Sequence, residues 1–234
     1  MAIYLGVKMK KLQTLIAAFL LSIFSATSAM SEYAVGVTGA YALLDASGTE
    51  TEGGEQTSTD IDHNFGLASI FAEYTMGSIT MGLDYIPFAA DVSENVKTRT
   101  DVETSVTSTA TETTTSRSQK AQAEIDQHIT LYASYELTPG FYIKAGYVMA
   151  DLTTTESLGT GSKYGDETLD GYTIGVGFQG DVGANSFMRG EYTYTDYDDI
   201  SLTSSVARTG VTTNNKVTGD IDVSQFKVSY GYKF

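Results

Sequence analysis

The clearest pattern of hydrophobic and polar positions covers residues 221–234, which read IDVSQFKVSYGYKF. From Phe226 onward, aromatic and β-branched residues stand at alternate positions, mostly with small or cationic residues between them. A period of two built from these residue types predicts a β-strand. One face of this strand is bulky and apolar while the other is small and polar. This suits a barrel wall with lipid outside and a narrow, polar lumen inside.

Seven more stretches of the chain show alternating hydrophobicity, and the connections between them are alternately long and short. The strands predicted from these patterns cover residues 33–41, 65–76, 79–86, 125–137, 141–152, 169–179, 187–197 and 221–234. Turn signals predict short turns at 76–78, 138–140 and 181–186, and polar composition predicts loops at about 43–64, 88–124, 153–168 and 198–219. The sequence therefore predicts an all-β fold, an eight-stranded antiparallel transmembrane up-and-down β-barrel.

Charged residues within the predicted strands indicate which face points into the lumen. An Arg or Lys that faces lipid at the midplane costs about 2–4 kcal/mol, so each charge is expected to point inward. In five strands this assignment leaves apolar residues outward; with Glu136 inward, for example, Leu131 and Tyr135 face the lipid. The charges expected in the lumen are Glu73, Asp84, Lys144, Arg189, Glu191 and Lys227. The rings expected to form interfacial girdles are Tyr33, Tyr41, Tyr85, Tyr135, Tyr147, Tyr172, Tyr192 and Phe234.

These lumen charges comprise three acids and three bases at similar depth. An unpaired ion inside a narrow barrel costs several kcal/mol, so we expect the charges to pair and, together with tyrosines and glycines, to plug the lumen. A plugged lumen predicts no steady, large conductance. The alternative is a small pore, which eight strands disfavour because side chains about fill their interior.

The stretch 88–124 is low in complexity and rich in Thr and Ser. Disorder is one interpretation of such a composition. Valine nevertheless recurs at even positions: Val92, Val96, Val102 and Val106. Because Thr is also a good strand former, we expect an extended hairpin that projects beyond the membrane and turns near 108–111. Similar arms are expected at 200–206 and 216–223.

The start of the chain has the organisation of an export signal. Lysines at 8, 10 and 11 are followed by a largely apolar run over 12–24 and by small residues up to Ala29. This pattern predicts a secretory signal peptide over residues 1–29 and an outer-membrane barrel over residues 30–234. The alternative is an N-terminal anchor, which the short apolar run disfavours. Met9 is an alternative start.

Composition narrows the class of protein further. The chain has no cysteine and no tryptophan but 16 tyrosines, 10 phenylalanines and 23 glycines. Its stability must therefore come from the closure of the hydrogen-bonded strands into a barrel or from the burial of apolar side chains, not from disulfides. The net charge of -15 argues against nucleic acid, because phosphates need a basic surface. Acidic loops can take up divalent cations, but no metal or cofactor site is predicted.

Two short motifs resemble those of enzymes. Residues 175–180 match G-x-G-x-x-G, but they lie in a predicted strand before a turn, whereas dinucleotide binding needs a following helix. Residues 128–130 (His-Ile-Thr) resemble the His-x-Ser of outer-membrane lipid A deacylases, whose pair sits on the lipid-facing wall. Here an inward Glu136 places the other even positions of its strand, His128 among them, inward as well. In addition, threonine replaces the serine. The chain has two histidines, His63 and His128, which are too few and too far apart in the sequence for a typical zinc site. Neither a zinc site nor a catalytic site is therefore expected.

The closing strand carries rings at Tyr230, Tyr232 and Phe234 and resembles the last strand of bacterial outer-membrane β-barrels. In that family the strand is read by the assembly machinery, so the resemblance implies that these three residues form an assembly signal and that the C-terminus is periplasmic. Over residues 30–234 the chain resembles the small eight-stranded outer-membrane barrels of the OmpA/OmpX type, the opacity-like surface barrels. The resemblance implies long extracellular loops, short periplasmic turns and a place in the bacterial outer membrane after signal cleavage.

The expected function is non-enzymatic: a surface barrel that displays long, acidic, Thr-rich loops for adhesion, recognition or envelope integrity. The alternatives are a small porin or channel and a lipid-modifying outer-membrane enzyme. The expected partners are outer-membrane lipid, the barrel assembly machinery and an extracellular surface or ligand bound through the loops. The barrel itself is expected to be a monomer.

Overall fold

The computed structural model describes residues 31–92, 97–106, 112–158, 162–207 and 212–234. The predicted signal peptide (1–29), the alternative start at Met9 and the hairpin turn expected at 108–111 lie outside the described residues.

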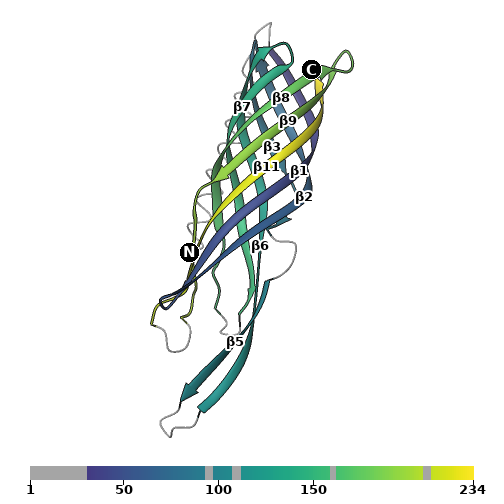
Figure 1. Ribbon diagram of the computed structural model, residues 1–234. Helices are drawn as coiled ribbons and strands as arrows, with labels where there is room; N and C mark the ends of the chain where they lie inside the picture. Colours follow the sequence, from purple (N-terminus) through teal and green to yellow (C-terminus); the bar gives the residue numbers. More distant parts are fainter. Residues whose placement is uncertain (1–30, 93–96, 107–111, 159–161, 208–211) are drawn as a thin grey trace.

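Within the described residues the chain forms eleven β-strands, eight of which close into one antiparallel barrel (Figure 1). The strands are β1 (Ser31–Glu52), β2 (Glu55–Met76), β3 (Ile79–Ile86), β4 (Ala90–Asp91), β5 (Lys97–Val106), β6 (Glu112–Thr138), β7 (Phe141–Ser157), β8 (Glu167–Asp181), β9 (Ser186–Tyr197), β10 (Ile200–Thr203) and β11 (Lys216–Lys233). Neighbours in the ring follow the order β1-β2-β3-β6-β7-β8-β9-β11, and β11 pairs with β1 to close it. The short strands β4, β5 and β10 extend the ladders of β6 and β11.

The predicted eight-stranded barrel and its three short turns are confirmed. The turn between β2 and β3 holds Gly77, and the turn between β6 and β7 holds Gly140. Both glycines have positive φ (61° and 83°), a conformation that glycine adopts without steric cost. Residues 182–185 join β8 to β9. All three turns lie at the upper end of the barrel in Figure 1, the end that also holds the C-terminus.

Strands extend into two regions that the sequence predicts as loops. Where the sequence predicts a loop over 43–64, β1 and β2 continue as a paired hairpin to a turn at Gly53 and Gly54. Strands β7 and β8 likewise take up part of the loop predicted over 153–168. The loop prediction is wrong here because polar side chains are typical both of loops and of strands that stand in water. A strand that stands in water accepts polar outward residues, and Thr favours strands.

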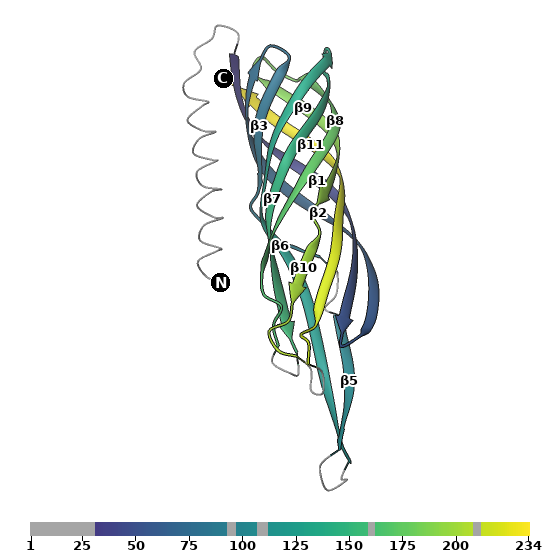
Figure 2. The ribbon, with the colours of Figure 1, turned by 90° about the vertical axis from the view of Figure 1, so that its left-hand side faces the viewer.

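The stretch 88–124 contains the extended hairpin that its valine pattern predicts. Strand β5 pairs along its whole length with β6. The hairpin projects beyond the lower end of the barrel in both ribbon views (Figures 1 and 2). Strand β10 and the start of β11 also pair, in agreement with the arms predicted at 200–206 and 216–223.

The alternation of inward and outward residues continues along each long strand, but the chemistry of the two faces changes. On the outer face of β1, the exposed Val35 and Val37 near the turns give way to Asp45 further along. On its inner face, the buried Thr38 gives way to the buried Leu44. The half near the turns is thus built to stand in lipid, and the opposite half, which we call the loop-side half, is built like a barrel in water. The expectation of a polar lumen is wrong for the loop-side half.

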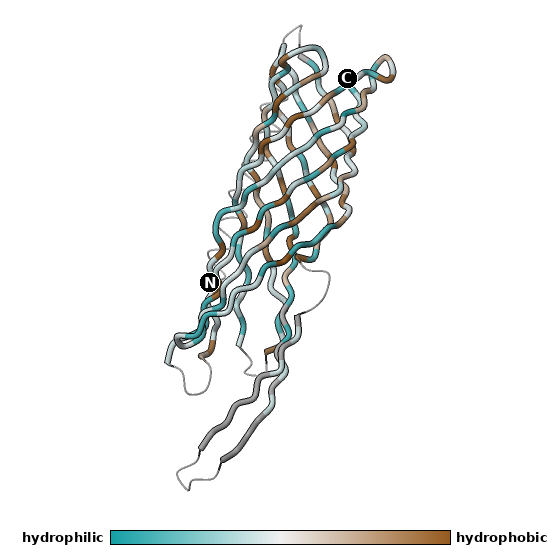
Figure 3. The backbone as a smooth tube through the Cα atoms, in the orientation of Figure 1, coloured by the Kyte–Doolittle hydropathy of each residue, from teal (hydrophilic) through white to brown (hydrophobic). Residues whose placement is uncertain are grey.

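Strand length explains this change of chemistry. Strand β1 has 22 residues, which span about 70 Å at ~3.3 Å per residue. With a tilt of about 35–45°, such a strand rises roughly 50–60 Å, whereas the apolar band of a membrane barrel is about 25 Å tall. The strands therefore extend well past the lipid. Figure 3 shows the hydrophilic tip of the β1–β2 hairpin at that far end.

Most of the rings predicted for the girdles lie exposed on the outer face, among them Tyr41, Tyr135, Tyr172, Tyr192 and Phe234.

No helix in the described ranges is long and apolar enough to cross a membrane.

Candidate functional site

An ion pair between Arg189 and Glu73 crosses the lumen at the end nearest the short turns. Nη1 and Nη2 of Arg189 donate to Oε1 and Oε2 of Glu73 at 2.6 and 2.8 Å, and both side chains are buried. The Tyr132 hydroxyl donates to the same Oε1 at 2.5 Å, and Gln179 Oε1 accepts from Arg189 Nη2 at 2.8 Å. Two parallel charge-assisted bonds fix the guanidinium plane against the carboxylate.

Lys144 and Glu191 form a second buried ion pair beside the first. Lys144 Nζ lies 2.9 Å from Glu191 Oε1. The same Nζ lies 3.7 Å from the centroid of the Tyr132 ring, which adds a cation–π attraction. Four of the six charges predicted for the lumen are therefore directly paired.

Asp84 and Lys227 are buried in the lumen without a direct ion pair in the described part of the chain. Asp84 Oδ2 accepts from the Ser69 hydroxyl at 2.9 Å, and Asp84 Oδ1 has no hydrogen-bond partner. The charge of Lys227 interacts with those of Asp84, Lys144 and Glu191 through space. Complete pairing of the six charges is thus a wrong expectation. Asp84 has a short side chain, and β3 is separated from β11 by two strands of the ring.

Aromatic rings fill the remaining space at this end, each packed over a glycine. A Cβ added at Gly36, Gly82, Gly177 or Gly231 would collide with Phe71, Tyr132, Tyr142 or Phe187, respectively. The guanidinium carbon of Arg189 lies 5.1–5.5 Å from three of these ring centroids. We call this set of side chains the plug: Phe71, Glu73, Tyr132, Tyr142, Lys144, Phe187, Arg189 and Glu191.

The structure places both enzyme-like motifs away from the arrangement that their chemistry needs. Residues 175–180 lie in β8 and lead into the turn to β9, so no helix follows them. His128 and Thr130 are buried in the lumen, where His128 Nε2 lies 2.9 Å from the hydroxyl of Tyr197. His63 lies in the loop-side half of β2 and stacks on Phe65. Within the described ranges, no group of three or more His, Cys, Asp or Glu side chains is placed to hold a metal ion.

The loop-side half contains a partly open cavity of about 540 Å³ whose lining is mainly apolar. Its apolar lining residues are Ala46, Ile61, Val92, Ala123, Leu152, Leu158, Ile200, Leu202, Val206, Val217 and Ile221. Several of them, such as Leu152 and Ile200, belong to a larger cluster of buried apolar side chains inside the barrel. The sequence therefore builds an apolar interior on the loop side of the plug, lined by side chains from most strands of the ring.

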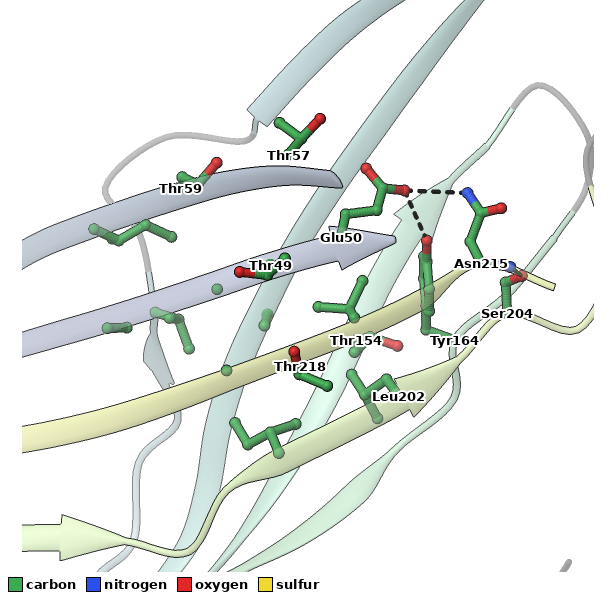
Figure 4. Close-up of a pocket in the computed structure, with 18 of the residues that line it drawn as sticks. Thr49, Glu50, Thr57, Thr59, Thr154, Tyr164, Leu202, Ser204, Asn215 and Thr218 are labelled. Carbon is green, nitrogen blue, oxygen red and sulfur yellow. Dashed lines mark hydrogen bonds between the residues drawn. The ribbon is translucent and has the colours of Figure 1, made fainter. Parts of the chain in front are cut away.

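Glu50, Tyr164 and Asn215 form the polar corner of this cavity (Figure 4). Glu50 Oε1 accepts from the Tyr164 hydroxyl at 3.1 Å and from Asn215 Nδ2 at 3.2 Å. Asn215 Oδ1 is buried and has no hydrogen-bond partner in the described structure. Burial, followed by the charge of Glu50, raises the pKa of Tyr164, so its hydroxyl stays protonated and donates at neutral pH.

A row of aspartates lies on the outer surface of the loop-side half. Asp45 stands opposite Asp62 on one neighbouring strand and Asp222 on the other, and Asp222 in turn stands opposite Asp196. We call these four residues the aspartate row. Like charges directly across a ladder destabilise it, so this row costs stability unless water and counter-ions screen it.

The closing strand places its three predicted signal residues, Tyr230, Tyr232 and Phe234, outward and exposed. The backbone N–H of Phe234 donates to the Tyr33 carbonyl at 2.8 Å, which adds to the closure of the barrel between β11 and β1. A role for these rings in assembly stays a prediction.

The pattern along the strands predicts the lumen charges but neither the cavity nor the aspartate row. A signal for both was present. Past the outward Tyr41 of β1, the inward positions turn apolar at Leu44 while the outward positions turn acidic at Asp45. The same reversal occurs between the inward Val223 and the outward Asp222 of β11.

Comparisons with known proteins agree with this architecture. The family model described as outer membrane protein beta-barrel domain matches residues 16–234. No curated protein matches the chain. Among solved structures, the outer membrane protein OprG from Pseudomonas aeruginosa is 14% identical with a TM-score of 0.52, and the match covers 87% of this chain and 96% of OprG.

Two further structures match with lower scores. The outer membrane protease OmpT from Escherichia coli is 11% identical over 90% of this chain and 99% of its own, with a TM-score of 0.47. The attachment invasion locus protein Ail of Yersinia pestis, solved in complex with the heparin analogue sucrose octasulfate, is 12% identical over 86% and 99%, with a TM-score of 0.39. At these identities the likeness shows the fold alone.

Proposed function

Because the chain belongs to the outer membrane protein beta-barrel domain family, we propose that it is a closed, non-enzymatic surface barrel. In this proposal the half near the short turns anchors the protein in the bacterial outer membrane, and the loop-side half stands outside the cell and recognises an extracellular surface or ligand. Membership of the family supports the location. The role of the loop-side half rests on the structure of this chain.

The plug is the observation that carries the proposal. Two ion pairs and four rings occupy the lumen near the short turns. Arg189 connects several of them, since it contacts Glu73, Gln179 and the surrounding rings. Breaking a buried ion pair costs about 3–5 kcal/mol, so the plug opens only rarely. This supports an anchor over a pore.

The position of His128 favours a non-enzymatic role over lipid modification. Its imidazole points into the lumen and contacts Tyr197, on the opposite side of the wall from the lipid. In the lipid A deacylases that residues 128–130 resemble, the histidine and its nucleophile lie on the lipid-facing wall.

The length of the loop-side half supports a role in recognition. Strands β1, β2, β6 and β11 continue beyond the membrane as paired strands, and the β5–β6 hairpin extends further still. Ordered strands present side chains in fixed positions, which favours specific contacts over those of a disordered tail.

Two measurements test the proposal. In planar bilayers the purified barrel should show no steady conductance, whereas a stable open channel would overturn the closed-anchor model. On the surface of a bacterium without adhesins of its own, the intact barrel should increase binding to immobilised extracellular-matrix proteins. A variant that lacks residues 97–119 but still reaches the surface should lose that gain; equal binding by both would refute recognition through the hairpin.

A further inference from the structure

We propose that the cavity in the loop-side half binds an uncharged apolar molecule that carries one hydroxyl group. The inference goes beyond the proposed surface role and rests on the cavity itself. Its test uses neither conductance nor cell adhesion, so either proposal can fail without the other.

The size and lining of the cavity fit a small apolar ligand. A volume of about 540 Å³ falls within the roughly 300–1,000 Å³ typical of small-molecule sites, which are mostly apolar with a few polar groups. Ile200, Leu202 and Val217 come from the two strands of one arm, and Ile61 and Leu152 come from other parts of the ring. Burial of an apolar chain against these side chains is favourable because it removes apolar surface from water.

The polar corner defines the head group. Glu50 already accepts hydrogen bonds from Tyr164 and Asn215, and this sets the Asn215 amide with its oxygen, Oδ1, unsatisfied. A buried acceptor without a partner costs free energy. A turn of the Asn215 side chain toward the cavity would let a ligand hydroxyl donate to Oδ1 and recover this cost. A hydroxyl group can supply that donor without a charge.

The charges around the cavity exclude an anionic ligand. Its described lining residues include Glu50, Glu52 and Asp220 but no Lys or Arg. A carboxylate or phosphate head would enter an apolar, acidic site without a positive partner, and burial of such an unpaired charge is expensive. The cavity should therefore prefer an alcohol to the fatty acid of equal length.

Ligand entry is expected from the loop end. The lining residues all lie in the loop-side half, and the plug fills the lumen toward the short turns. A molecule that enters the cavity is thus retained there and does not cross the barrel. The plug therefore makes the cavity a binding site and not part of a conduction path.

Photo-crosslinking tests the proposal on the complete barrel in lipid nanodiscs. Three probes share a ten-carbon chain with a diazirine: one ends in a hydroxyl, one in a carboxylate and one in a methyl group. Mass spectrometry maps the labelled residues. Lipid-facing residues such as Ile174 and Val228 report how much of each probe is in the bilayer, so labelling at Leu202 and Val217 is divided by labelling at these positions.

The alcohol probe should give the highest cavity-to-lipid-face ratio. We expect it to exceed the alkane by about three- to tenfold, the worth of one hydrogen bond, and the carboxylate by roughly tenfold or more. Equal ratios for the three probes, or labelling confined to Ile174 and Val228, would overturn the proposal.

Matched variants show whether the cavity and its polar corner cause the preference. Val217→Trp fills the cavity and should abolish labelling there, whereas the outward Val228→Trp should leave it unchanged. Asn215→Leu should lower the alcohol ratio to that of the alkane, and Glu50→Gln should raise the carboxylate ratio. Each variant is first checked for heat-modifiable migration. If Val217→Trp does not fold, Asn215→Leu decides: an unchanged alcohol preference would refute the assignment of the head-group site.

Discussion

Arg189 and Glu73 are joined through both carboxylate oxygens across the lumen, although they lie 116 positions apart in the sequence. The pair links β9 to β2, which are not neighbours in the ring. It therefore ties opposite walls together through side chains alone. A barrel closed this way resists both opening and the passage of ions, and several consequences can be measured.

Loss of Arg189 should destabilise the barrel strongly. Arg189→Ala leaves Glu73 buried and unpaired, so we expect a loss of about 3–5 kcal/mol in the free energy of unfolding. The double variant with Glu73→Ala should cost less than the sum of the two single changes, because neither charge is then left alone. Urea unfolding in detergent micelles measures the free energy of unfolding of the natural protein, the two single variants and the double variant. Strict additivity would show that the ion pair contributes nothing to stability.

A methyl group at Gly231 should disturb the plug. Its Cβ would overlap the ring of Phe187, so Gly231→Ala should cost about 1–3 kcal/mol, as overpacking of a core does. Gly190→Ala is the matched control, since a Cβ there meets nothing within 4 Å. Addition of Phe187→Leu should restore part of the loss at Gly231. Equal unfolding midpoints for the two alanine variants would contradict the ring-over-glycine packing.

The carboxyl pair Asp199 and Asp220 should make stability depend on pH. A hydrogen bond with Asp220 and its charge raise the pKa of Asp199 above the ordinary value of 3.8. A raised pKa in the folded state means that folding retains a proton. The contribution of Asp199 to the free energy of unfolding is therefore fully present below pH 3.8 and is lost as pH rises through the raised pKa.

Asp220→Asn should remove most of this dependence, so that the variant gains stability relative to the natural protein as pH rises above about 4. The unfolding midpoint in urea between pH 3 and 7 measures the difference. Glu167→Gln, which also removes one exposed carboxylate, is the control and should keep the natural profile. Parallel pH curves for the natural protein and Asp220→Asn would show that the two carboxyls do not share a proton.

Deletion of the β5–β6 hairpin should leave the barrel intact. Strand β5 pairs with β6 alone, and the pairing of β6 with β7 begins only at Lys120. Removal of residues 97–119 therefore breaks no ladder of the ring. The variant should keep heat-modifiable migration and a protease-resistant core of barrel size. Loss of that core would mean that the hairpin contributes to the folding of the barrel.

Removal of Phe234 should impair assembly in cells more than stability in vitro. Its side chain is exposed and its backbone N–H adds one hydrogen bond to Tyr33, so refolding into micelles should change little. If the closing strand is a recognition signal, the folded fraction in outer membranes should fall several-fold. The comparison of cellular yield with refolding yield separates the two effects, and an unchanged cellular yield would refute the signal.

The sequence by itself determined the number of strands, their short turns and the direction of most charged side chains. These features follow from local rules: a period of two along each strand, glycine in tight turns such as that at Gly140, and the high cost of a charge such as Lys144 in lipid. Each rule acts within a few residues, so a reader of the sequence can apply it without knowing which strands meet. The extension of β5 and β6 into a hairpin could be predicted for the same reason.

Only the tertiary structure decided where the membrane part ends and which side chains meet in the lumen. Beyond Leu43 the outward residues of β1 turn polar because they meet water. The same polar residues predict a loop when the surroundings of the strand are unknown. Three features depend on the stagger between strands distant in sequence: the pairing of Arg189 with Glu73, the lack of a direct ion pair between Asp84 and Lys227, and the convergence of Glu50 and Asn215 on one cavity. That stagger is fixed when the barrel closes, because closure sets the relative height of every residue on every strand.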